Sequence, residues 1–209
     1  MGRVNSSVIT KHSLNKKGIS DGDEIEFIQQ APVSQAGDAA RIVVLHSEVN
    51  EVTISTIIMQ LLLLANQNRD PIHLVISTYG GSVDEMFSLY DTIKFLPCPV
   101  HTIALGKVMS AGVLLLASGA KGHRMIGKSA RVMMHSISVG GRSGNVFEAM
   151  NDLEEHKRLQ DLSVTAIQKE TKMSRQQIEK IMSTGRDFFM TPEEAIKYGI
   201  VDKIIGSDK

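Results

Sequence analysis

Short runs of β-branched residues alternate along this chain with stretches of helical periodicity. The runs are rich in Ile and Val and predict strands, and we expect the first of them to be buried. The segments between them place apolar residues three and four positions apart, as amphipathic helices do. Strands that alternate with helices form a mostly parallel sheet, so the pattern predicts an α/β fold. The predicted strands are 42–45, 72–77 and 100–105, and the predicted helices are 52–65 and 83–95.

The second half of the chain continues the pattern less regularly. A strongly charged stretch, 154–158, lies in the middle of the longest predicted helix, so we expect this helix to project from the domain. The helix at 52–65 carries more apolar residues than one face needs, which indicates a second contact, with another subunit as a candidate. The further predictions are a helix at 111–117, strands at 123–127 and 131–135, a loop at 138–144, a helix at 146–172, capping-box helices beginning at Ser174 and Thr191, and a strand at 200–205.

The first 40 residues differ from the rest, because they are polar and carry only one short apolar patch. We therefore divide the 209 residues into a flexible N-terminal segment, 1–40, and one folded domain, 41–209. A plain disordered tail is the alternative for the first segment.

Composition excludes several classes of function. Lys and Arg together number 23, and so do Asp and Glu, a balance that argues against a nucleic-acid binder. The single cysteine, Cys98, allows no intrachain disulfide and no cysteine-rich zinc site. No apolar run approaches the ~20 residues of a membrane span. We expect no cofactor, no metal, no membrane and no nucleic-acid partner, and a cytoplasmic location, with an organelle or a virus-infected host cell as alternatives.

Three segments stand where a parallel sheet carries its ligand sites, at the carboxyl ends of strands. Gly80-Gly81 precedes a predicted helix and could offer backbone N–H groups to a developing oxyanion, although an ordinary turn is the alternative. Ser110 begins the helix at 111–117, where its local sequence also fits a simple N-cap. His135 ends a predicted strand, and a structural histidine is its alternative role. His123 shows no partner in the pattern.

Taken together and in order, the motifs of this chain resemble those of the proteolytic subunits of Clp protease, the ClpP family. The resemblance covers about 41–205, and no single motif within it would be specific alone. The motifs are Ser-Thr-Tyr-Gly-Gly-Ser (77–82), Tyr-Asp-Thr-Ile (90–93), Gly-Lys-Val-Met-Ser-Ala-Gly (106–112), Ala-Ser-Gly-Ala-Lys-Gly (117–122), Arg-Val-Met-Met-His (131–135), Arg-Asp-Phe-Phe-Met (186–190) and Glu-Ala-Ile-Lys-Tyr-Gly-Ile-Val-Asp (194–202).

The resemblance implies a ClpP/crotonase-like fold with stacked ββα units and a protruding handle helix. It implies a serine endopeptidase in which Ser110 is the nucleophile, His135 the base and Asp187 the third triad member. The implied oxyanion donors are the backbone N–H groups of Gly81 and Ala111. Arg186 matches a residue that couples contacts between subunits to the geometry of the active site.

The resemblance also implies partners. Family members form a homo-oligomer of heptameric rings, a tetradecamer, and hydrolyse unfolded polypeptides that a AAA+ Clp ATPase feeds to them. The chain departs from the family pattern at Tyr79, at Ser136-Ile137 and over residues 1–40, where the family has its axial-pore segment. Three alternatives to an active peptidase of this kind are a catalytically silent ring component or adaptor, a viral maturation-type protease, and an acyl-CoA enzyme of the same broad fold.

Overall fold

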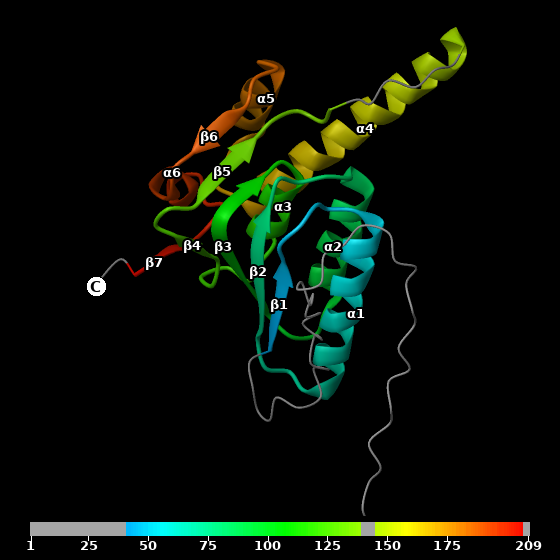
Figure 1. Cartoon of the computed structure of the whole chain (residues 1–209). Helices are drawn as coiled ribbons and strands as arrows, with labels where there is room; N and C mark the ends of the chain where they lie inside the picture. The colour runs from blue at the N-terminus through cyan, green and yellow to red at the C-terminus, as the bar shows by residue number, and fades with distance from the viewer. Residues whose placement is uncertain (1–40, 139–144, 207–209) are drawn as a thin grey trace, which may run out of the picture. The chain divides into compact units, whose positions relative to one another are not determined.

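The computed structural model describes residues 41–138 and 145–206 of the chain (Figure 1). The segment 1–40, predicted to be a flexible N-terminal part, lies outside these residues. So does the predicted loop at 138–144, apart from Ser138.

A mostly parallel sheet forms the centre of the described domain, as predicted. Five of its strands are all parallel and are hydrogen-bonded in the order β1-β2-β3-β4-β7. These strands are β1 (Ile42–Leu45), β2 (Ile72–Thr78), β3 (Val100–Met109), β4 (Met125–Gly127) and β7 (Lys203–Ile205). The predicted strands at 42–45, 72–77 and 100–105 are therefore confirmed, although β3 is longer than expected.

Among the described residues, helices cover one face of the β1–β3 part of this sheet and not the other. Val43 and Leu45 of β1 are buried beneath them, whereas Ile42 and Val44 on the other face are 50% and 53% exposed. The prediction that the first strand is buried was therefore wrong for half of its residues. The β-branched run predicted the strand correctly, but it does not reveal how many faces of the sheet are covered.

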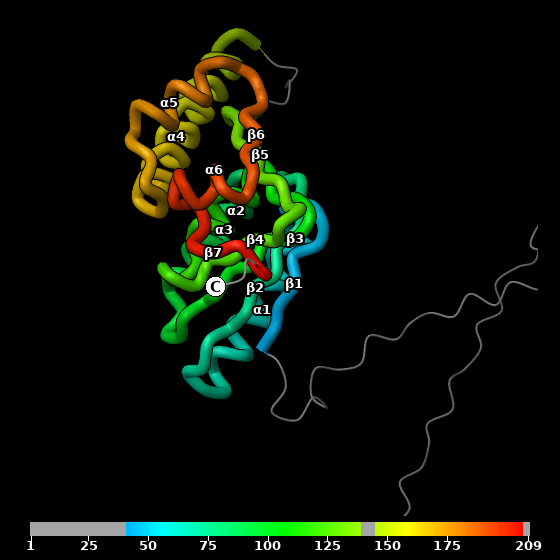
Figure 2. Tube along the Cα trace, turned by 90° about the vertical axis from the view of Figure 1, so that its left-hand side faces the viewer, coloured from blue at the N-terminus to red at the C-terminus, as the bar shows by residue number. Residues whose placement is uncertain are grey.

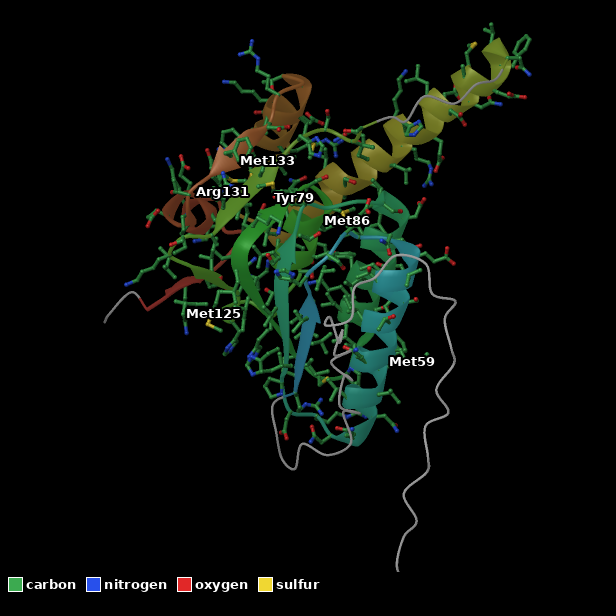
Figure 3. The ribbon with its side chains drawn as sticks, viewed as in Figure 1. Met59, Tyr79, Met86, Met125, Arg131 and Met133 are labelled. Carbon is green, nitrogen blue, oxygen red and sulfur yellow. The ribbon has the colours of Figure 1, made fainter. Side chains whose placement is uncertain are left out.

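Three helices form the covering layer: α1 (Glu51–Gln67), α2 (Val83–Phe95) and α3 (Ala111–Ala117). Every residue of α3 is buried. Helix α1 buries one stripe and leaves the opposite one, including Met59 and Leu63, exposed (Figure 3). The contact of this second stripe with another subunit stays a prediction. Within residues 41–138 and 145–206, no helix combines the length and apolarity needed to cross a membrane.

Strand β3 bends at Gly106 and pairs with a different neighbour on each side of the bend. Before the bend, Ile103 and Ala104 pair with β4, and after it Lys107 to Met109 pair with β5 (Arg131–Met134). Gly106 has a φ of +72°, a conformation that glycine adopts at little cost. The strand predicted to end at Leu105 therefore runs on to Met109, because the glycine turns the chain without ending the ladder.

Strand β6 (Phe188–Met190) completes the sheet by pairing antiparallel with β5, and it was not predicted. Three residues are too few to show a periodicity. Figure 2 shows β5 and β6 side by side next to α6 (Pro192–Lys197). Capping boxes begin both α6 and α5 (Arg175–Ser183), as the sequence predicts.

Helix α4 (Val146–Glu170) is the predicted projecting helix, and its first half extends away from the sheet (Figure 1). Its buried residues begin only at Ser163. Asn145 caps it through a full capping box with Glu148, which stabilises an end that has few tertiary contacts. The prediction of a protruding handle is confirmed.

A buried guanidinium joins Asp202, the residue before β7, to helices α3 and α4. Arg124, only 3% exposed, donates from Nε and Nη2 to the Asp202 carboxylate at 2.9 and 2.7 Å. Its Nη1 donates to the carbonyl oxygens of Ala117 and Glu170. Burial by itself raises the pKa of Asp202, but the hydrogen bonds and charge of Arg124 outweigh it and lower that pKa to about 2.

We expect Asp202→Asn to destabilise the domain by about 3 kcal/mol at neutral pH, because Arg124 would keep a buried charge without its counter-ion. The folded-state pKa of Asp202 lies below its ordinary value of 3.8, so the stability from ionisation is complete above pH 4 and disappears as the pH falls through about 2. Urea unfolding at several pH values should therefore show a difference in the free energy of unfolding between wild type and Asp202→Asn that becomes smaller below pH 4. Asp70→Asn, at an exposed position, is the control. A difference between wild type and Asp202→Asn that is the same at every pH would contradict the role of the Asp202 carboxylate.

Candidate active site

Ser110 occupies the sharp junction between β3 and α3. Its φ of 53° is the only positive φ of a non-glycine residue within the described ranges, a conformation with a real energetic cost. The backbone N–H of Ser110 donates to the Met133 carbonyl at 2.8 Å, which ties the junction to β5. Its hydroxyl makes no capping bond to α3, so the alternative of a simple N-cap is wrong.

His135 lies beside Ser110 because β3 and β5 are parallel neighbours. Met109 stands opposite Met133, so Ser110 and His135, one and two residues further on, lie at the same edge of the sheet. The Nε2 atom of His135 lies 2.7 Å from Oγ of Ser110, within hydrogen-bond distance. The structure thus brings together two of the three residues that the resemblance assigns to a triad.

Asp187, the third of them, is not joined to this pair. Its side chain is exposed, and no hydrogen bond or ion pair links it to His135 in the part of the chain described here. Asp187 precedes β6, where Phe188 pairs with Met134. Continuing this antiparallel register by one residue sets Asp187 opposite His135. Arg186 is exposed beside it, and both line a separate cavity.

The Gly80-Gly81 segment is held close to the same junction. A Cβ built on Gly80 would lie 2.7 Å from the Cβ of Ser110, so only glycine allows this approach. Gly81 has a φ of +150° and forms a parallel bridge with Val49. The Gly80 N–H donates to Thr78 Oγ1, but the N–H groups of Gly81 and Ala111 have no acceptor among the described residues. These two N–H donors belong to residues that line the same cavity as Ser110.

One cavity of about 320 Å³ joins these groups. Gly81, Ser110, Ala111 and His135 line it, and most of its remaining wall is apolar. Tyr79, at the position where the chain departs from the family pattern, lines the cavity too and is 70% exposed. Lys107 lies over the Tyr79 ring at 4.5 Å from its centroid. The cavity can hold an uncharged group against a hydroxyl, an imidazole and two N–H donors.

Sequence reasoning missed most of the residues that form the apolar wall. They come from β5 and four helices, and nothing in the local sequence marks them as neighbours. Among them are Val83, Met86, Val113, Leu114, Met133, Met134, Ile167 and Met182, and one polar residue, Ser163, lines the same wall. Figure 3 labels Met86 and Met133, which come from α2 and β5. His123 also has a neighbour that was not predicted, because its ring stacks on His101 at 4.1 Å.

A parallel α/β fold with a serine–histidine pair at a strained strand–helix junction is typical of hydrolases. Comparison with known proteins is more specific. The profile of the Clp protease family matches residues 29–208, beginning before the stretch that the motifs covered. The ATP-dependent Clp protease proteolytic subunit of Deinococcus radiodurans is 37% identical over 166 residues, which are 79% of this chain and 80% of that protein.

A second relative agrees. The ATP-dependent Clp protease proteolytic subunit 1 of Rhodopirellula baltica is 39% identical over 166 residues, covering 79% of this chain and 72% of that protein. The chain belongs to the Clp protease family. It is a ClpP-like protease, as the resemblance implied.

Proposed function

We propose that this chain is a serine endopeptidase that uses Ser110 as its nucleophile and His135 as its base. The observation that carries the proposal is the 2.7 Å separation of Ser110 Oγ and His135 Nε2 inside a cavity. In the first step His135 takes the hydroxyl proton while Oγ attacks the peptide carbonyl carbon. The imidazolium then gives this proton to the leaving amine, and an acyl-enzyme remains. A water molecule, activated by the same imidazole, releases the acid and restores Ser110.

The oxyanion formed at each attack needs donors that are already in place. We assign this role to the backbone N–H groups of Gly81 and Ala111, which have no other acceptor among the described residues and line the same cavity as Ser110. Ala111 is 5% exposed, so its donor acts where water screens the charge poorly.

Gly81→Ala should lower kcat by roughly 10²- to 10³-fold, the usual cost of losing one oxyanion donor. The new Cβ would lie 2.2 Å from the Val49 carbonyl oxygen, so the loop must move and take its N–H away. Gly122→Ala is a matched control: its φ is +84°, but a Cβ there meets nothing within 4 Å. The control should cost about 1 kcal/mol of stability and leave kcat unchanged. Equal kcat for Gly81→Ala and Gly122→Ala would contradict the oxyanion role of Gly81.

Asp187 is the proposed third member, and Arg186 the proposed link to neighbouring subunits. The register of β5 and β6 supports the first assignment, since it sets Asp187 opposite His135. A carboxylate there would hold the imidazole in the tautomer that accepts the serine proton. The exposed position of Arg186 beside it leaves its side chain available to another subunit.

We further propose that the chain works as a homo-oligomer of heptameric rings, acting on unfolded polypeptides with a Clp ATPase as partner. The names of the two relatives, which are proteolytic subunits of ATP-dependent proteases, support the partner and the assembly. Exposed apolar residues on α1 and on the projecting half of α4 support contacts between copies. Broad acceptance of peptide sequences would follow if the segment after His135 held the substrate through its main chain.

The test is hydrolysis of short fluorogenic peptides by the purified protein, with native mass measured on the same sample. Cleavage by an oligomer, blocked by a fluorophosphonate, is the expected result. An intact oligomer that cleaves no peptide would contradict the proposal and favour the catalytically silent ring component. A stable monomer without activity would contradict both the mechanism and the assembly.

A further inference from the structure

The cavity beside Ser110 carries one feature that its apolar character does not explain. Four helices contribute to its wall, and within the described residues Ser163 of α4 is the only polar side chain among their contributions. The other helical members are Val83, Met86, Ala111, Val113, Leu114, Ile167 and Met182. Ser163 therefore brings the one hydroxyl into the helical part of the wall, whereas the other hydroxyls that line the cavity, apart from that of Ser110, belong to Tyr79, Ser136 and Ser138 outside the helices.

This hydroxyl is buried and has no hydrogen-bond partner among residues 41–138 and 145–206. Ser163 is 5% exposed, and its Oγ neither donates to nor accepts from any group that the structure describes. A helical hydroxyl normally has a partner at hand, the carbonyl four residues earlier. Three helical threonines use that partner here, Thr56, Thr92 and Thr165, and so does Thr171 at the C-cap of α4. Ser163 does not use it. Burying a polar group without a hydrogen bond destabilises the fold, so a buried unpaired hydroxyl needs an explanation.

We propose that Ser163 is a specificity residue that selects the side chain on the amino side of the cleaved bond, the P1 side chain. The inference rests on the proposed function, since it takes the cavity to be the pocket of a peptidase. A P1 side chain with an apolar body and a neutral hydrogen-bonding tip satisfies both the wall and the hydroxyl. A purely apolar side chain excludes water and leaves the Ser163 hydroxyl unpaired. A charged side chain loses its hydration without gaining a counter-ion.

Tyrosine and phenylalanine at P1 form the sharpest pair for a test, because they differ by one hydroxyl. We expect the purified protein to cleave the tyrosine peptide with a kcat/KM roughly five- to tenfold above that of the phenylalanine peptide. Ser163→Ala should bring this ratio close to one, mainly by lowering kcat/KM for tyrosine. The rate of fluorophosphonate labelling should stay unchanged in Ser163→Ala, which checks that the site remains assembled.

Thr165→Ala provides a matched control on the same helix. It removes a hydroxyl that donates to the Asp161 carbonyl, accepts from Nη1 of Arg175 and does not line the cavity, so the ratio should stay at its wild-type value. The same ratio in wild type and Ser163→Ala would overturn the role of Ser163 while leaving the peptidase mechanism intact. A wild-type protein that neither cleaves the peptides nor takes the label would overturn the proposed function, and this inference with it.

Discussion

Ser110→Ala should reduce peptide hydrolysis by about 10⁶-fold, to the level left when a serine protease loses its nucleophile. The change removes the proposed nucleophile, whose Oγ lies 2.7 Å from Nε2 of His135. The stability of the fold should not change, because the Ser110 hydroxyl makes no capping bond and alanine keeps the backbone N–H that donates to the Met133 carbonyl. The measurement is kcat with a fluorogenic peptide, together with the midpoint of thermal unfolding.

The control for this variant is Ser55→Ala, which removes an exposed hydroxyl that bonds only its own helix. We expect wild-type kcat for the control and an unchanged unfolding midpoint for both variants. Substantial turnover by folded Ser110→Ala would show that another group attacks the peptide, and the mechanism would have to be abandoned.

Asp187→Asn should lower kcat by about 10⁴-fold, the loss seen when an asparagine holds a catalytic imidazole in the wrong tautomer. The prediction is demanding, because the Asp187 side chain is exposed and makes no bond to His135 in the part of the chain that is described. It rests on the resemblance and on the β5–β6 register. Substrate affinity should change little, since Asp187 does not line the cavity beside Ser110.

The exposed Asp70→Asn is the matched control and should keep full activity. The decisive comparison is kcat at saturating peptide for the two asparagine variants. A folded Asp187→Asn with the kcat of wild type would show that His135 works without this carboxylate. The proposed roles of Ser110 and His135 would then be kept, and the assignment of Asp187 as the third triad member would be rejected.

Much of the fold and part of the site could be predicted because their signals are local. Helix α2 was predicted with its observed ends, since Ser82 caps it and Pro97 follows it. Ser110 and His135 could be named because each ends a strand of a parallel sheet, and parallel strands end at one edge. The resemblance then distinguished them from a simple N-cap and a structural histidine.

Contacts between distant segments could not be predicted in the same way. Gly106 looked like the end of a strand, and only the pairing of the following residues with β5 shows that it is a bend. Arg124 and Asp202 are 78 residues apart, and nothing near either marks the other as its partner. The same holds for Ser163, whose importance depends on a cavity that five elements build together.

The most direct test of the central claim is to treat the purified protein with a fluorophosphonate and locate the adduct by peptide mass mapping. A serine reacts with this reagent only when a neighbouring base and oxyanion donors activate it. The account predicts one adduct per chain, on Ser110, and almost none when His135 is replaced by alanine. An adduct on another residue, or undiminished labelling of the His135→Ala protein, would contradict it.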